Sequence, residues 1–140
     1  MPQNINATQF YFEMCTPNEI STLIQSLSVN KSCGPNSIPV FLLKELKDIV
    51  SVPLAFLFNK TFSSGTFPEI FKLAKVIPVF KIGDRNKCCN YRPISLLSNI
   101  GKLLEKVVHQ QLYKYFEDNK LQYKFQFRFR LKGTYASKRK

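Results

Sequence analysis

The sequence is poor in the residues that build metal centres and acid–base catalytic sites. Its 140 residues include one histidine and nine acidic residues, and there is no tryptophan. The four cysteines (Cys15, Cys33, Cys88 and Cys89) have no spacing typical of zinc sites, and His109 falls within a helical repeat. No Gly-rich phosphate loop and no nucleophile triad are recognisable. These absences predict no metal site and no catalytic residue in this chain.

Long apolar runs and targeting signals are also missing. The longest apolar run, residues 50–58, is interrupted by Pro53 and is far shorter than the roughly 20 residues that a membrane helix needs. The N-terminus has no basic segment followed by an apolar one, so no secretory signal is predicted. We therefore expect an intracellular protein, cytoplasmic or nuclear, with reduced cysteines and no membrane partner. No linker divides the chain, and residues 1–140 are predicted to form a single domain.

Positive charge, by contrast, is abundant. Lysine and arginine number 21 against nine acids, which gives a formal net charge of +12 and favours a polyanion such as nucleic acid as partner. The charge is concentrated between residues 72 and 92, where Asp84 is the single acid. The basic residues there are Lys72, Lys75, Lys81, Arg85, Lys87 and Arg92. A strand that delivers such side chains to a loop is suited to binding phosphate.

Hydrophobic periodicity predicts helices before this basic stretch. Thr16, Pro17 and Glu19 are typical of a capping box, and the helix they begin is predicted to end near residues 29–30. A second helix is predicted to open at Pro39. A third is predicted to begin near residues 52–53 and to stop at a glycine, Gly65; it is apolar nearly all round and is therefore expected to be buried.

The basic stretch and the region after it contain one clear strand and one long helix. Residues 74–80 have strand character and lead into a Gly83-Asp84 turn. The long helix is predicted to be capped by Ser98 or Asn99 and to end by Asn119, with one continuous apolar face.

The two ends of the chain each leave two alternatives open. Residues 10–14 alternate weakly and predict either an edge strand or an extended arm. In the tail, aromatic residues alternate with basic ones around Arg128 and Arg130. This pattern indicates either a groove for single-stranded nucleic acid or a strand that has lost its sheet.

Several motifs occur in a recognisable order. They are the loop 31–39, the strand and turn 76–84, the segment 90–98, the helical segment 102–106 and the block 126–130. The most specific is Tyr91-Arg92-Pro93-Ile94-Ser95 together with the Lys-Gly-Asp block before it. In this order the motifs resemble the reverse transcriptases of non-LTR retrotransposons, in particular jockey-like elements, over roughly residues 10–130.

The resemblance implies an N-terminal part of such an enzyme. The implied fold is α+β and mostly α, the truncated fingers region of a right-hand polymerase with a small, incomplete β-sheet or hairpin. It divides the chain into a helical lead-in (10–71), a fingers strand with a basic loop (72–98), a long helix (99–119) and a basic aromatic tail (120–140).

The resemblance also implies roles for the basic residues. In that family a lysine and an arginine of the fingers hairpin close over the triphosphate of the incoming nucleotide, and motif matching places them at Lys81 and Arg92. Fixed cations stabilise the charge that develops in phosphoryl transfer. The alternatives are a solvated strand end for Lys81 and a tie between loop and helix for Arg92. Further candidates for nucleic-acid binding are Lys75, Arg85, Lys87, Arg128 and Arg130.

The carboxylates that such polymerases use to hold metal ions are not recognisable here. The family supplies them from a strand ending in Asp and from a Tyr-x-Asp-Asp hairpin, and the nearest similar segment, residues 115–118, is predicted to be a helix end. The intact enzyme is expected to use Mg²⁺, an RNA template, a DNA primer and deoxynucleotides. This chain departs from the family at Asn36-Ser37 and Arg128, and we expect a truncated or decayed copy that is inactive alone.

Two alternatives to this interpretation stay open at this point. One is a small basic nucleic-acid-binding module without catalysis, and the other is a relic without function. The apolar faces that would pack on the rest of a polymerase are expected to cause self-association when left uncovered.

Overall fold

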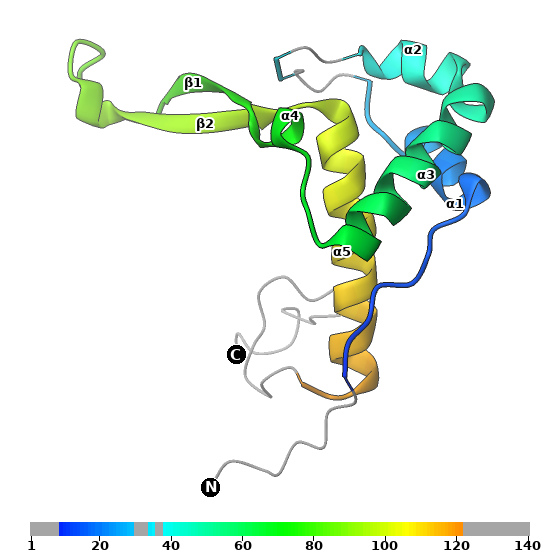
Figure 1. The fold of residues 1–140 in the computed structure, drawn as a ribbon. Coiled ribbons are helices and arrows are strands. Elements are labelled where there is room, and N and C mark those ends of the chain that lie inside the picture. The colour runs from blue at the N-terminus through cyan, green and yellow to red at the C-terminus, as the bar shows by residue number, and fades with distance from the viewer. Residues whose placement is uncertain (1–8, 30–33, 36–37, 122–140) are drawn as a thin grey trace, which may run out of the picture.

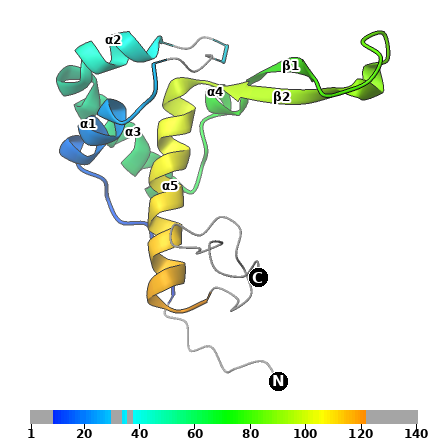
Figure 2. The same ribbon diagram turned by 180° about the vertical axis from the view of Figure 1, so that it is seen from behind.

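A computed structural model describes residues 9–29, 34–35 and 38–121, and it shows a helical body from which one β-hairpin projects (Figure 1). The elements are α1 (Pro17–Gln25), α2 (Val40–Glu45), α3 (Lys47–Ser64), α4 (Glu69–Lys72), β1 (Ala74–Phe80), a 3₁₀ turn (Cys88–Asn90), β2 (Tyr91–Leu97) and α5 (Asn99–Asp118). The helices α1, α2 and α3 lie on one side of α5, and the hairpin extends away on the other (Figures 1 and 2). The predicted mixture of helix and sheet, mostly helical, is confirmed.

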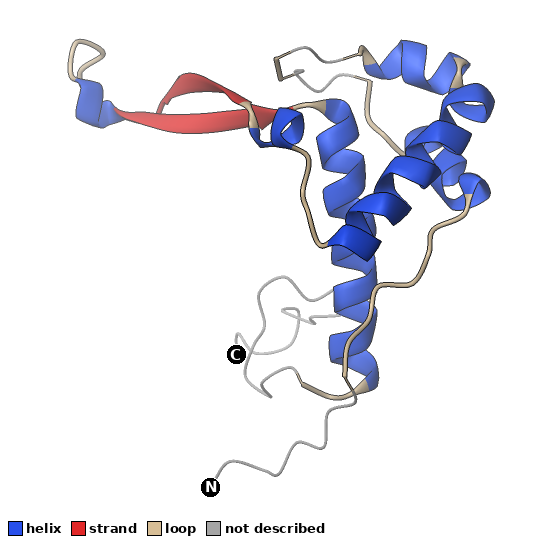
Figure 3. Ribbon diagram, in the orientation of Figure 1, coloured by secondary structure: helices blue, strands red, loops and turns tan. Residues whose placement is uncertain are grey.

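One hydrophobic core joins the helices. Its fully buried side chains come from four helices and are Ile20, Ile24, Leu43, Phe58, Leu103 and Leu104. The stripes predicted for α1 and α5 therefore both contribute to this core, together with residues of α2 and α3. Among the described residues, none of those in β1 or β2 belongs to this core, and Figure 3 shows the sheet standing apart from the helices.

The predicted start and burial of α3 are wrong. The helix begins at Lys47 and Pro53 lies inside it, on the exposed side, where water can bond to the Ile49 carbonyl that the missing proline N–H leaves without a helical partner. Only one face of α3 is buried. On the other face Ile49, Val52 and Phe56 are 72%, 58% and 71% exposed.

The predicted helix caps are largely confirmed. The Thr16 hydroxyl accepts the Glu19 N–H at 3.3 Å, and the Glu19 carboxylate accepts the Thr16 N–H at 2.8 Å, which completes the capping box of α1. Gly65, at φ 64°, ends α3 as predicted. Ser98 caps α5, which ends at Asp118. However, α1 ends at Gln25, earlier than predicted.

Residues 9–16 form an extended arm rather than a strand, and the arm runs along α5 (Figure 1). Two side-chain amides bind its backbone. Gln111 of α5 accepts the Glu13 N–H and donates to the Glu13 carbonyl, both at 2.9 Å. Asn59 of α3 binds Cys15 in the same way, at 2.8 and 3.0 Å, and also accepts the Cys15 thiol at 3.1 Å. Burial raises the pKa of the Cys15 thiol, which keeps it protonated for this bond.

Replacing Asn59 by alanine is expected to lower the free energy of unfolding by about 1–3 kcal/mol, because the N–H and carbonyl of Cys15 lose their partner. Urea denaturation of the 140-residue chain measures the effect. Lys60→Ala, which removes an exposed side chain from the next position of the same helix, is the control. Equal unfolding midpoints for the two variants would show that the arm does not depend on the Asn59 amide.

The hairpin has an unbroken antiparallel register from Ala74↔Leu97 to Phe80↔Tyr91. The Lys81 N–H donates to the Asn90 carbonyl at 2.8 Å, so this opposed pair is hydrogen-bonded. Since hydrogen-bonded and non-hydrogen-bonded pairs alternate, the opposed prolines Pro78 and Pro93 occupy a non-hydrogen-bonded pair. A proline is tolerated there because its nitrogen points away from the partner strand.

The base of the hairpin is held by the loop that precedes α2. A Cβ atom added to Gly34 would lie 2.4 Å from the carbonyl oxygen of Leu96, so a side chain at this position would collide with β2. The Asn99 side-chain amide donates to the Ile38 carbonyl at 2.8 Å. These contacts fix where the hairpin leaves the helical body.

Candidate phosphate-binding hairpin

The register of the hairpin sorts its side chains onto two faces. Paired residues share a face and successive residues alternate between faces. The basic face, as we call it, carries Lys75, Ile77, Val79 and Lys81 opposite Leu96, Ile94, Arg92 and Asn90. The aromatic face carries Ala74, Val76, Pro78 and Phe80 opposite Leu97, Ser95, Pro93 and Tyr91.

The basic face brings the two predicted phosphate ligands together. Arg92 is opposite Val79, and Lys81 lies two residues after Val79, just beyond the end of β1, so Lys81 and Arg92 are diagonal neighbours. Diagonal neighbours in antiparallel sheets lie roughly 7–8 Å apart, which is close enough for two long side chains to reach one phosphate group. Both residues are exposed, and within the described part of the chain neither forms a salt bridge.

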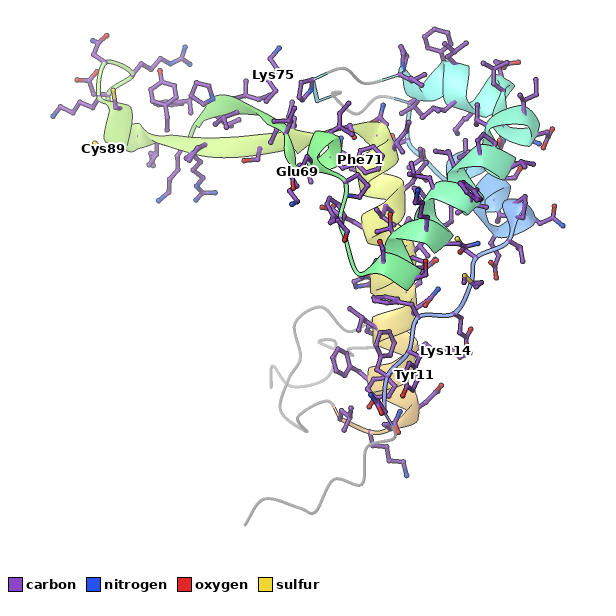
Figure 4. The ribbon with its side chains drawn as sticks, in the orientation of Figure 1. Tyr11, Glu69, Phe71, Lys75, Cys89 and Lys114 are labelled. Carbon is purple, nitrogen blue, oxygen red and sulfur yellow. The ribbon has the colours of Figure 1, made fainter. Side chains whose placement is uncertain are left out.

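The other candidates are placed differently. Lys75 shares the basic face but lies near the base of the hairpin (Figure 4), six residues and therefore roughly 20 Å from Lys81. Lys87 is exposed in the tip loop. Arg128 and Arg130, with the rest of the predicted tail, lie outside the described residues.

Arg85 belongs to the aromatic face rather than to the Lys81–Arg92 pair. Its guanidinium carbon lies 5.1 Å from the centroid of the Phe80 ring, a cation–π contact. Phe80 packs edge-on against Tyr91 at 5.6 Å, and the Tyr91 hydroxyl donates to the Arg85 carbonyl at 2.9 Å. The two aromatic residues that flank the loop were the sequence signal for this contact.

Asp84, the single acid of the basic stretch, forms hydrogen bonds within its own loop. The Asp84 carboxylate accepts the Asn86 N–H at 2.9 Å. Its carbonyl accepts the Asn90 side-chain amide at 2.7 Å and the Lys87 N–H at 3.3 Å. No sequence pattern singles out Asn90, which the structure places at the centre of these contacts.

No clustered metal ligands occur in the described part of the chain: no group of three or more His, Cys, Asp or Glu side chains gathers there. Cys88 and Cys89 are exposed free thiols at the hairpin tip, where Figure 4 labels Cys89. Residues 115–118 form the last turn of α5, as predicted. None of the described helices combines the length and apolar character needed to cross a membrane.

The sequence of the chain is similar to those of known proteins. No protein-family model matches the chain. The RNA-directed DNA polymerase from mobile element jockey of Drosophila melanogaster is 34% identical over 121 residues, or 85% of this chain. The jockey polymerase of Drosophila funebris is 30% identical over 131 residues (88%). The probable RNA-directed DNA polymerase from transposon BS of Drosophila melanogaster is 32% identical over 113 residues (80%).

The chain is a partial homologue of these non-LTR retrotransposon polymerases. It spans only 13%, 14% and 12% of the lengths of the three relatives. The resemblance to jockey-like elements that the ordered motifs indicate is thereby confirmed. In this polymerase homologue, Lys81 and Arg92 are exposed diagonal neighbours on one face of the hairpin.

Proposed function

We propose that the chain is the fingers part of a right-hand RNA-directed DNA polymerase and that its hairpin binds the phosphates of an incoming deoxynucleotide. The observation that carries the proposal is the diagonal placement of Lys81 and Arg92 on one exposed face. Arg92 can form a bidentate fork with phosphate oxygens, whereas Lys81 acts as a compact point charge. Negative charge that builds up during phosphoryl transfer is stabilised by such fixed cations.

The proposal gives this part of the polymerase a binding role rather than a metal-holding one. Mg²⁺ needs a set of oxygen ligands, and the described residues bring no group of carboxylates together.

The RNA template and DNA primer are the proposed partners of the intact polymerase. The exposed side chains Phe41, Ile49 and Phe56 form apolar surface that we propose packs on the rest of the polymerase, and that favours self-association in the chain alone.

A second candidate function is binding of nucleic acid without catalysis. Lys75 favours it, because this lysine shares the basic face but is too far from Lys81 for both to bind one triphosphate. A polynucleotide backbone could contact both.

The 140-residue chain is expected to extend no primer on an RNA template, with Mg²⁺ or Mn²⁺, because no group of carboxylates that could hold these ions gathers among its described residues. A radiolabelled primer-extension assay tests this, with a full-length jockey polymerase as the positive control. Robust extension by the purified chain would contradict the proposed division between phosphate binding and metal binding.

A further inference from the structure

The tip of the hairpin is organised around the side chain of Asn90. Its amide nitrogen donates to the Asp84 carbonyl at 2.7 Å, across the loop. Its backbone N–H donates to the Lys87 carbonyl at 3.0 Å, and its carbonyl accepts the Lys81 N–H at 2.8 Å. One residue therefore joins the end of β1, the turn and the start of β2.

The Asn90 amide lies close against Gly83. Gly83 has φ +99°, and a Cβ atom added to it would lie 2.8 Å from the amide nitrogen of Asn90. A side chain at position 83 would therefore displace the Asn90 amide or the turn. The glycine is required both by its backbone conformation and by this close approach.

We infer that Asn90 is the positioning residue that holds Lys81 opposite β2 and beside Arg92. The inference rests on the proposed phosphate-binding function. Lys81 lies just beyond β1, and the bond from its N–H to the Asn90 carbonyl extends the pairing by one residue. Without the Asn90 amide bond to the Asp84 carbonyl, only the backbone bond to Lys81 closes the end of the ladder. We expect this last pair to fray, so that Lys81 no longer stays beside Arg92 and the two cations cease to act on one group.

The effect is expected to be local. Among the described residues, those of the hairpin contribute nothing to the hydrophobic core, so a change at the tip leaves the helical body intact. The Asn90 side chain can thus be altered without unfolding the chain, which separates positioning from general stability.

The test uses Asn90→Leu in the full 140-residue chain, with inorganic tripolyphosphate as the probe and titration calorimetry as the measurement. Loss of the amide bond is expected to weaken binding about tenfold, with an unchanged thermal unfolding midpoint. Asn86→Leu, in the same exposed loop, is the matched control, because Asn86 contacts Asp84 through its backbone N–H. Gly83→Ala is expected to weaken binding by displacing the same amide.

The decisive readout is the coupling between Asn90 and Lys81. Lys81→Ala is expected to reduce affinity strongly in the native sequence and only slightly in the Asn90→Leu chain, since the lysine is already displaced. The same fold-change in both backgrounds, or native affinity for Asn90→Leu, would overturn the positioning role. If Lys81→Ala and Arg92→Ala both leave tripolyphosphate binding unchanged in the native sequence, the proposed function fails and takes this inference with it.

Discussion

Phe58→Ala is expected to lower the free energy of unfolding by about 3–5 kcal/mol. Phe58 of α3 is fully buried in the core, together with side chains of α1, α2 and α5. Truncation removes apolar contacts and leaves a cavity that these helices cannot close without shifting. Because domains of this size are stable by only about 5–15 kcal/mol, much of the chain's stability would be lost. Urea denaturation followed by circular dichroism measures the change.

Phe56→Ala is the matched control for this prediction. Phe56 lies on the same helix, two residues away, and is 71% exposed. Its truncation is expected to change the free energy of unfolding by less than about 0.5 kcal/mol. Similar losses for the two variants at a concentration where the chain is monomeric would contradict the exposure of Phe56 on this face of α3.

Removing Lys81 or Arg92 is expected to weaken binding of tripolyphosphate about 10- to 100-fold for each alanine variant. Each cation forms charge-assisted hydrogen bonds worth about 1.5–3 kcal/mol with the phosphate oxygens. Arg92→Lys is expected to restore only part of the affinity, because lysine cannot form the bidentate fork. With an RNA–DNA hybrid as ligand, each alanine variant is expected to reduce the slope of log affinity against log salt by about one.

Two control variants test whether tripolyphosphate binding depends on Lys81 and Arg92 in particular. Lys60→Ala removes one exposed charge from the helical body and is expected to leave tripolyphosphate affinity almost unchanged. Lys75→Ala separates the two candidate functions: it is expected to weaken binding of the hybrid but not of tripolyphosphate. If Lys60→Ala weakens tripolyphosphate binding as much as Lys81→Ala does, the binding reflects net charge and not the hairpin pair.

Elements with local signals could be predicted from the sequence, and elements without them could not. The capping box at Thr16 and the cap at Ser98 are short-range hydrogen-bonding patterns, so the starts of α1 and α5 were correctly predicted. Pro53 was misinterpreted as a helix start because proline favours that position; in the folded chain it lies on an exposed side where its missing donor costs less. β2 contains a proline and has no regular alternation, and its strand conformation depends on pairing with β1.

The candidate site, too, could be predicted from the sequence only in part. Motif matching predicted Lys81 and Arg92 as a pair, but only the register shows that they share a face. Arg85 has the same charge and lies only four residues from Lys81, yet its contact with Phe80 places it on the other side. Sequence spacing cannot show this, because the direction of a loop side chain depends on contacts made across the loop.

The opposed prolines of the hairpin bear on aggregation. A two-stranded ribbon with exposed apolar residues such as Val76 and Ile94 would ordinarily invite further strands to pair along its edges. At a non-hydrogen-bonded pair the nitrogens of Pro78 and Pro93 point outward, one at each edge, and neither carries a hydrogen to donate. Both edges are therefore interrupted near their midpoint. Copies of the hairpin that associate are therefore expected to meet through their side chains rather than by extending the sheet, which opposes amyloid-like stacking of this ribbon.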